Sequence, residues 1–319
     1  MMPIGDAPQG EHDHSTTEPA IREILASLGL SNSGLRWVES YSHSAWMTDD
    51  SVVRYRIIGP TGRLLHEAKV ATLLPREALY PAVIATGCSG HNDWLVTARV
   101  PGESLLAAWP RLSMAQRETA SHEVASAARA LHAAPAQHLQ PPCLFGGAPV
   151  IERRDFIDTL ADVARRAPDG DGRDLDRVLG LLDRYRAFVD DGPRVMAHHD
   201  LNFGQCIWRG GHVVGLVDLE MAHANSADWD LTDLLGMCAD PGRGAPSDTD
   251  RLVHPADFTN VPVWFKEAYA EPFAHPALKE RLRVYELVYR LAQLTQRPDL
   301  AQMLAILEHG TLYEHLLPE

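Results

Sequence analysis

Three residues between positions 195 and 235 have side chains suited to binding a divalent cation. Asp200 follows two histidines, Gln205 lies further along the same segment, and Asp218 ends an apolar run. Carboxylate and amide oxygens are ligands that Mg²⁺ accepts, and this ion commonly binds the phosphates of a substrate as well. Two carboxylates with an amide between them therefore predict a Mg²⁺ site whose partner carries phosphate.

The elements around these residues indicate how the two carboxylates meet. Residues 205–209 and 213–217 are predicted to form the strands of a β-hairpin, with Gly210-Gly211 as its turn. Asp200 and Asp218 both lie where a loop meets a strand. We therefore expect the hairpin to hold both carboxylates at one rim.

The pattern of this stretch resembles a known family. It reads His198-x-Asp200-Leu201-x-x-x-Gln205, then a hairpin, then Asp218-Leu219-Glu220 and Asp230-Leu231. This is similar to the catalytic-loop and metal-loop signature of the protein-kinase-like fold, in the branch of aminoglycoside phosphotransferases and choline kinases. The resemblance implies an α+β fold with two lobes, a small antiparallel β lobe and a larger, mainly helical lobe.

The sequence departs from the family pattern at two positions. Gln205 stands where the family has Asn, and His199 stands where it usually has Gly. Gln keeps a carbonyl oxygen for a metal but adds a methylene group. A plainer alternative is that the acidic residues only cap turns and helices, with Asp228 or Asp230 as an N-cap. That alternative leaves the order of the other matching segments unexplained.

The resemblance implies a role for each residue of the stretch. Asp200 orients the acceptor hydroxyl and takes its proton, while Asp218 and Gln205 hold Mg²⁺ against the phosphates. Asp230 accepts N–H bonds that brace the catalytic loop, and His198 packs and hydrogen-bonds the same loop. The residues expected on the structural and acceptor side are His198, His199, Glu220 and Asp230.

Residues before position 100 are expected to bind the nucleotide. The strand 51–57 carries Arg54, with Arg56 as the fallback, as the cation that pairs with the phosphates. Glu67, in a predicted helix over 63–74, is expected to hold that arginine, and the alternative is an exposed helix position. The residues expected at the nucleotide are Arg54, Glu67, Ser42, Ser44, Thr97 and Arg99.

Ser42 and Ser44 flank the first turn of the small lobe, which contains no glycine. The two serines are expected either to bond phosphate oxygens or to form a plain hairpin turn. Residues 95–99 are expected to be the hinge, where backbone groups bond adenine. Pro101-Gly102 marks the boundary between the lobes.

The chain is expected to have three parts. Residues 1–18 form a mobile tail, residues 19–100 the nucleotide-binding lobe, and residues 101–319 the catalytic and acceptor-binding lobe. A helix over 17–30 is expected to be capped by Thr17 and ended by Gly29. Further helices are expected over 115–132, 155–167, 175–189, 263–270, 278–294 and 300–308.

Composition narrows the class of partner. The chain has 29 basic and 43 acidic residues and a formal net charge of −14, which disfavours nucleic acid and anionic membranes. No apolar run reaches the roughly 20 residues that cross a bilayer, and the first residues do not resemble a signal peptide. The four cysteines show neither metal spacing nor the density of a secreted scaffold, so a cytoplasmic location is expected. The sequence does not indicate an oligomeric state.

These observations predict an ATP- and Mg²⁺-dependent kinase of a small hydroxylated molecule. Clustered acidic residues, including Glu220, Asp228 and Asp233, favour an amine-bearing acceptor of the antibiotic type, such as an aminoglycoside. The first alternative is a metabolite kinase acting on choline, an amino sugar or a biosynthetic intermediate. The second is a nucleotide-binding pseudokinase, which only Gln205 favours.

Overall fold

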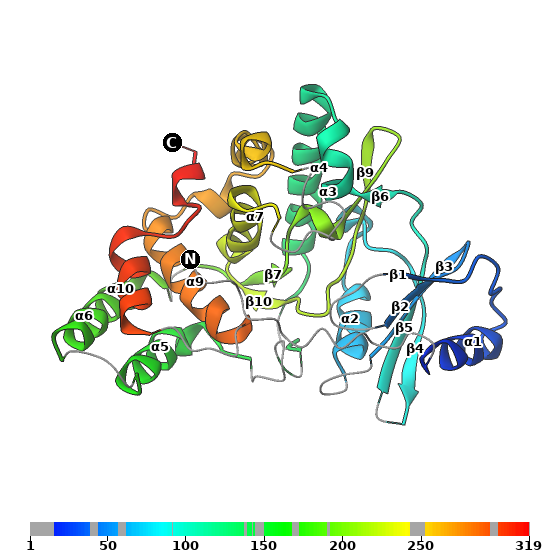
Figure 1. The fold of residues 1–319 in the computed structure, drawn as a ribbon, viewed down its shortest axis with the longest axis horizontal. Coiled ribbons are helices and arrows are strands. Elements are labelled where there is room, and N and C mark those ends of the chain that lie inside the picture. Colours follow the sequence, from blue (N-terminus) through cyan, green and yellow to red (C-terminus); the bar gives the residue numbers. More distant parts are fainter. Residues whose placement is uncertain are drawn as a thin grey trace. The chain divides into compact units, whose positions relative to one another are not determined.

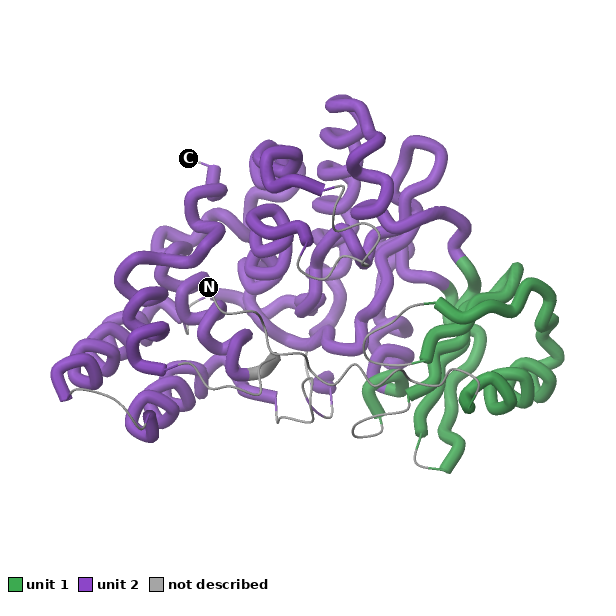
Figure 2. Tube along the Cα trace, in the orientation of Figure 1, with its two compact units in different colours: residues 1–65, 82–99 green, residues 66–81, 100–319 purple. Residues whose placement is uncertain are grey.

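A computed structural model describes residues 16–38, 44–56, 62–90, 92–136, 139–141, 143, 150–167, 172–189, 192–242, 253–293 and 299–318. The chain divides into two compact units, residues 1–65 with 82–99 and residues 66–81 with 100–319 (Figure 2). The sequence prediction placed residues 66–81 with the N-terminal lobe, whereas their contacts group them with the second unit. The expected α+β fold class is confirmed, because one unit is built on a sheet and the other is mainly helical (Figure 1).

The first unit is built on a five-stranded antiparallel sheet with the order β1-β2-β3-β5-β4. Its strands are β1 (Arg36–Val38), β2 (Ser44–Met47), β3 (Ser51–Tyr55), β4 (Val83–Ser89) and β5 (Asn92–Ala98). Gly87 of β4 pairs with Trp94 of β5, and a Cβ at Gly87 would lie 2.5 Å from the Trp94 ring, so the close contact requires glycine.

Helix α1 (Glu18–Ser27) supplies the apolar partner of this sheet. Ile21 and Leu25 are fully buried in one cluster with Trp46 and Val53. The expected cap by Thr17 is wrong, because its side chain makes no cap bond to the helix. The Thr17 hydroxyl instead accepts a bond from the indole of Trp46 and bonds the Ser44 hydroxyl at 2.8 Å, which ties the helix start to β2.

Helix α2 (Arg63–Ala71) begins in the first unit and continues into the second. Its first turn is capped from a distant strand, because Asp93 Oδ2 accepts bonds from the backbone N–H groups of Gly62 (3.0 Å) and Leu64 (2.8 Å). A carboxylate at a helix N-terminus is favoured by the helix dipole as well as by these bonds. The Asp93 carboxylate also pairs with Arg56 at 3.5 Å, and both side chains are buried.

The second unit contains two small antiparallel sheets. Strands β6 (Glu103–Ser104), β8 (Cys206–Arg209) and β9 (His212–Leu216) form one, and β7 (Val195–Ala197) with β10 (His223–Asn225) forms the other. Strands β8 and β9 are the expected hairpin, and its turn residues Gly210 and Gly211 have φ angles of 61° and 91°. The predicted hairpin is confirmed because both turn positions take the positive φ angles that glycine adopts without strain.

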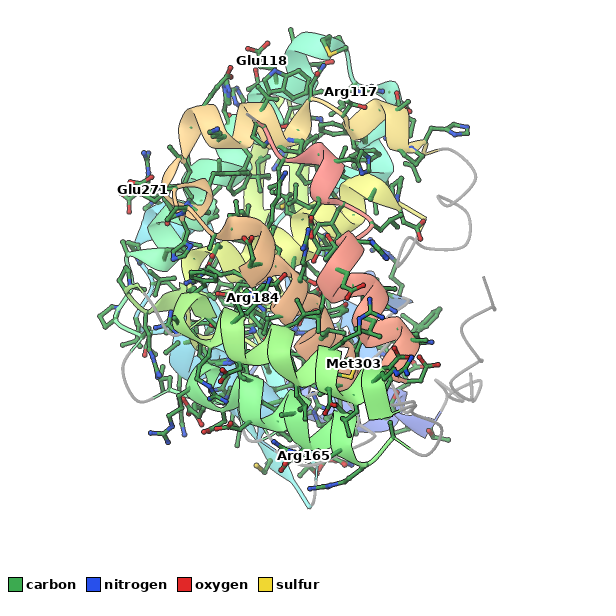
Figure 3. The ribbon with its side chains drawn as sticks, turned by 90° about the vertical axis from the view of Figure 1, so that its left-hand side faces the viewer. Arg117, Glu118, Arg165, Arg184, Glu271 and Met303 are labelled. Atoms are coloured by element: carbon green, nitrogen blue, oxygen red, sulfur yellow. The ribbon has the colours of Figure 1, made fainter. Side chains whose placement is uncertain are left out.

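Helices surround these sheets in the second unit. They are α3 (Leu105–Ala108), α4 (Met114–His132), α5 (Phe156–Arg165), α6 (Gly172–Val189), α7 (Asp230–Ala239), α8 (Val261–Ala268), α9 (Leu278–Gln293) and α10 (Leu300–His309). Figure 3 faces α5 and α6, which carry the labelled Arg165 and Arg184, beside α10 with the buried Met303. Among the described residues, no helix is both long and apolar enough to cross a membrane.

Helix α4 is the central element of this unit. It packs against α8 and against the strands β7 and β9. The helix begins with a capping box. The Ser113 side chain accepts a bond from the backbone N–H of Gln116, and the Gln116 side-chain oxygen accepts a bond from the backbone N–H of Ser113. Its buried face ends in a polar residue, His132, which is 6% exposed. A polar side chain at that depth requires hydrogen-bond partners.

Candidate functional site

The loop after β7 carries the first site residues and has an unusual backbone conformation. His199 has a φ angle of 65°, which is the left-handed region that glycine adopts most easily. This explains why glycine is usual at this position of the related pattern. The histidine ring is held by stacking on His223, with centroids 3.6 Å apart and planes 13° apart.

Asp230 binds this loop through two hydrogen bonds and helix α4 through a third. Its Oδ1 accepts from the backbone N–H of His199 (2.9 Å), and its Oδ2 accepts from the backbone N–H of His198 (2.8 Å) and from Nε2 of His132 (2.9 Å). Burial alone would raise the pKa of Asp230, but the bonds and charges of His132 and His198 hold it below its usual value. Asp230 is the first residue of α7 and makes no N-cap bond, so the helix-cap alternative does not describe it.

Asp200 lies at the end of the loop with both carboxylate oxygens oriented by amides. Gln205 Nε2 donates to Oδ2 at 2.6 Å, and Asn202 Nδ2 donates to Oδ1 at 2.9 Å. The side-chain nitrogen of Gln205 is therefore hydrogen-bonded to Asp200, and the side-chain oxygen Oε1 is the atom that suits a metal ion. Asn202 Oδ1 in turn accepts a bond from the backbone N–H of Gly204 at 2.8 Å. The side chains of Asp200, Asn202 and Gln205 are therefore joined in one hydrogen-bonded network around this turn.

Asp218 lies next to this turn and is also in the left-handed region, with a φ angle of 66°. Both backbone groups of the preceding residue, Val217, are hydrogen-bonded. Its N–H donates to the backbone carbonyl of Gln205 (2.9 Å), and its carbonyl accepts from His198 Nε2 (3.1 Å). The residue after it, Leu219, donates its N–H to Glu67 Oε1 at 3.0 Å. The backbone on each side of Asp218 is therefore fixed.

The charges of Asp218 and Glu220 act on the carboxyl group of Asp200. Burial first, and then the charges of Asp218 and Glu220, raise the pKa of Asp200 to about 8, against the lowering effect of the Gln205 and Asn202 bonds. A divalent cation would reverse that effect by favouring the ionised carboxylates. A donor set made of carboxylate and amide oxygens suits Mg²⁺.

Glu67 is fully buried, so the alternative of an exposed helix position is wrong. Its Oε1 accepts a bond from the Tyr80 hydroxyl at 2.7 Å in addition to the Leu219 N–H. The expected ion pair with Arg54 joins residues of different units and stays a prediction. The geometry links Glu67 to the segment that carries Asp218.

The remaining nucleotide-side residues lie in the first unit. Arg54 is half-buried on β3, and the fallback Arg56 is buried with Asp93 as its partner. The Ser44 hydroxyl is 2% exposed and bonds Thr17 and Trp46, and Ser42 lies outside the described residues.

Two hinge residues follow on β5 and directly after it. Thr97 is buried, at 7% exposure, and pairs with Val52 in the sheet. Arg99 donates from Nη1 to the backbone carbonyls of Thr48 and Asp49, at 3.5 and 3.3 Å. The roles of these residues at a nucleotide stay predictions.

The acceptor side is less acidic than the sequence suggested. Asp228 forms a buried pair with Arg281, which donates from Nη2 to Oδ1 at 3.0 Å, so its charge is neutralised. Glu220 is 1% exposed and contributes to the electrostatics of Asp200. The nearby aromatic residues Trp229 and Tyr269 are buried in the core.

Sequence reasoning missed three partners of the site, namely His66, Tyr80 and His132. His132 ends the apolar stripe of its helix at the spacing of Ala128 and Leu131, so a polar residue on a buried face was the signal that could have found it. His66 and Tyr80 gave no comparable signal, because their partners lie on other segments of the chain.

Comparisons with known proteins identify a family and a fold for this chain. The family model described as "Phosphotransferase enzyme family" matches residues 42–264. No curated protein matches the chain.

Solved structures with the same fold include the GDP complex of aminoglycoside 2'-phosphotransferase-IIIa, at 16% identity and a TM-score of 0.62, covering 91% of this chain and 97% of that one. A ternary complex of aminoglycoside phosphotransferase APH(4)-Ia with ADP and hygromycin B has 17% identity and a TM-score of 0.56, covering 85% and 90%. Aminoglycoside-3'-phosphotransferase of type VIII has 21% identity and a TM-score of 0.51, covering 86% and 100%.

Proposed function

This chain belongs to the phosphotransferase enzyme family, and we propose that it transfers the γ-phosphoryl group of ATP to a hydroxyl of a small, amine-bearing molecule in a Mg²⁺-dependent reaction. The observation that carries the proposal is the cluster of Asp200, Gln205 and Asp218, in which two carboxylates and an amide converge on one turn. Two of the related structures are nucleotide complexes, one with ADP and one with GDP.

Asp200 is the proposed general base. The acceptor oxygen forms a bond to the γ-phosphorus while the bond to the β–γ bridging oxygen breaks, and the hydroxyl proton passes to Asp200 as ADP departs. Gln205 and Asn202 orient the carboxylate, so that one oxygen faces the hydroxyl in a fixed geometry. Positioning of this kind is the main demand that phosphoryl transfer makes on a protein.

The Asp218 carboxylate and the side-chain amide oxygen of Gln205 are the proposed ligands of Mg²⁺. When bound, the ion neutralises charge on the β- and γ-phosphate oxygens. Arg54 is the proposed cation for the phosphates on the nucleotide side, and the backbone around Thr97 and Arg99 is the proposed adenine site. A guanidinium group suits this role because it stays charged and binds two oxygens at once.

The amine-bearing acceptor is supported by three acidic side chains that influence one another, Asp200, Asp218 and Glu220. An ammonium group near ionised carboxylates gains Coulomb energy that a neutral acceptor lacks. The related APH(4)-Ia complex contains hygromycin B together with ADP. A metabolite carrying an amine and a hydroxyl satisfies the same charges, so both acceptor classes enter the test.

The experiment is ADP release measured over a panel of aminoglycosides, amino alcohols and hydroxylated sugars without an amine. We expect release with at least one amine-bearing acceptor. Asp200→Asn should reduce the rate by roughly 10²–10⁴-fold, the range that a positioned base contributes, while nucleotide binding stays within about twofold. Asp218→Asn should weaken nucleotide binding only when Mg²⁺ is present.

Asp158→Asn is the matched control, because Asp158 is an exposed surface residue that pairs with Arg186 on α6. It should leave both nucleotide binding and ADP release unchanged. Nucleotide binding without ADP release for any acceptor would favour a pseudokinase, and equal turnover in wild type and Asp200→Asn would contradict the assigned base.

A further inference from the structure

His66, which the family pattern does not specify, contacts the segment that carries Asp218, and Tyr80 contacts Glu67, which bonds the same segment. We propose that His66 and Tyr80 are positioning residues for Asp218, an inference that rests on the proposed function. Both lie in the segment 66–81, which belongs to the same compact unit as Asp218. Neither needs to touch a substrate or the metal ion, since each acts through the backbone or through Glu67.

His66 fixes the far end of the segment. Its Nε2 lies 2.6 Å from the carbonyl oxygen of Ala222, and the side chain is 4% exposed. A carbonyl oxygen only accepts hydrogen bonds, so the imidazole carries its proton on Nε2 and donates it. Ala222 in turn donates its N–H to the Leu219 carbonyl at 3.1 Å, which closes a tight turn directly after Asp218.

Tyr80 fixes the orientation of the Glu67 carboxylate. Its hydroxyl donates to Oε1 at 2.7 Å, and the same oxygen accepts the Leu219 N–H at 3.0 Å. A carboxylate held by one bond can rotate about its last torsion, whereas a second donor on the same oxygen restricts that rotation. Tyr80 therefore keeps Oε1 aimed at the residue that follows Asp218.

The His66–Ala222 bond and the Leu219–Glu67 bond belong to a set of three between the segment 66–81 and residues 216–222. The third is the N–H of Leu216, which donates to the Leu79 carbonyl at 3.1 Å. The segment 66–81 thus holds residues 216, 219 and 222, before and after Asp218. We call these three bonds the α2 clamp, since Glu67 and His66 lie on α2 and Leu79 lies after its end.

The α2 clamp matters because Asp218 is in a strained backbone conformation. Its φ angle of 66° is unfavourable for a residue with a side chain, and such a conformation persists only where the surroundings hold it. Removing one bond of the clamp lets the backbone relax and moves the carboxylate away from the metal position. Groups that orient a metal ligand in this way typically contribute roughly 10–100-fold in metal affinity.

The test measures Mg²⁺ affinity and does not require a known acceptor. Mg²⁺ is titrated by calorimetry into protein saturated with AMP-PNP or GMP-PNP, whichever the wild type binds. We expect Tyr80→Phe, which removes one oxygen atom, to weaken the apparent Mg²⁺ affinity by about tenfold. Nucleotide affinity without Mg²⁺ should stay within about twofold, because neither residue is placed at the nucleotide.

His66 provides a rescue experiment. His66→Leu removes the donor and should weaken Mg²⁺ affinity by about tenfold. His66→Gln should bring the affinity back to within about threefold of wild type, because the Gln Nε2 lies near the position of the imidazole Nε2 and donates to a carbonyl. A residue that only filled space would give the opposite order, since leucine packs in a buried site more readily than glutamine.

Tyr185→Phe is the matched control for Tyr80→Phe. Tyr185 is buried, whereas Tyr80 is half-buried, and the Tyr185 hydroxyl donates to the Leu307 carbonyl at 3.0 Å, on α6 and α10 and away from the clamp. This variant should keep the wild-type Mg²⁺ affinity. Should His66→Leu fail to fold, Tyr80→Phe against Tyr185→Phe decides the question.

The possible failures are distinguishable. Mg²⁺-dependent nucleotide binding in the wild type, with equal affinity in Tyr80→Phe and His66→Leu, would overturn the positioning role and leave the proposed function standing. Absence of Mg²⁺-dependent nucleotide binding in the wild type would overturn the proposed function and this inference together. Equal weakening in Tyr80→Phe and Tyr185→Phe would also overturn the inference, because the effect would then be general destabilisation.

Discussion

Asp230→Asn tests how the catalytic loop is held. The change keeps the shape of the side chain but replaces one acceptor oxygen by an NH₂ donor. The wild-type carboxylate accepts the backbone N–H groups of His198 and His199 and the Nε2–H of His132, at 2.8, 2.9 and 2.9 Å. Whichever way the new amide is turned, its NH₂ group faces at least one of the two buried backbone N–H groups.

The magnitude follows from that conflict. One buried N–H without an acceptor costs about 1–3 kcal/mol. The remaining bonds change from charge-assisted to neutral, which removes about 1 kcal/mol from each of two bonds. The sum is about 3–5 kcal/mol, within the range measured when one member of a buried charged network is removed. For a domain of this size, that loss corresponds to a melting temperature lower by roughly 5–10 °C.

The assay is thermal unfolding followed by circular dichroism, combined with ADP release on the acceptor found in the panel. We expect the lower melting temperature together with a release rate at least about tenfold lower, because a loop that has lost an anchor no longer fixes Asp200. Asp158→Asn, the exposed control, should leave both values unchanged. Asp230→Asn with wild-type stability and wild-type turnover would refute the bracing role.

Two further predictions concern the framework of the second unit. Burial lowers the pKa of His223 from 6.5 to about 4. Between these pH values His223 is protonated in the unfolded chain but neutral in the folded chain. The free energy of unfolding therefore falls as the pH falls, by up to about 3 kcal/mol in total. His223→Phe should therefore show a smaller drop in urea midpoint between pH 7 and pH 5 than wild type, and an equal drop would contradict the assignment. Gly102 has a φ angle of 155°, and a Cβ there would lie 2.7 Å from the Trp208 carbonyl oxygen, so Gly102→Ala should cost about 2–3 kcal/mol. Gly180→Ala in α6, where a Cβ meets nothing within 4 Å, should instead stabilise by about 0.5–1 kcal/mol, and equal effects of the two changes would sink the steric argument.

Several features of the fold could be predicted because their causes are local. The hairpin of β8 and β9 follows from Gly210-Gly211, since only glycine takes two positive φ angles in succession without strain. The long helix α4 follows from a period of apolar residues and ends within a residue of its predicted bounds. The family pattern likewise lies within one stretch, so the identity of Asp200 and Asp218 as site residues required no knowledge of distant contacts.

Other predictions failed where a distant partner decided the outcome. Thr17 was expected to cap α1, but Ser44 and Trp46, on a neighbouring strand, bind its hydroxyl. Asp228 was expected to add charge to the acceptor side, but Arg281 from α9 neutralises it. In both cases the residue type indicated that the side chain would form polar interactions, and its partner was determined by the tertiary structure.

The sequence by itself determined which side chains are able to bind a cation and a phosphate, and the local turns and helices that carry them. Only the tertiary structure decided which groups hold those side chains in place, as with His66 on Ala222, Tyr80 on Glu67 and His132 on Asp230. The physical reason is range. Backbone preference and apolar period act over a few residues, whereas a buried hydrogen bond forms with whichever donor or acceptor the folded chain brings within about 3 Å.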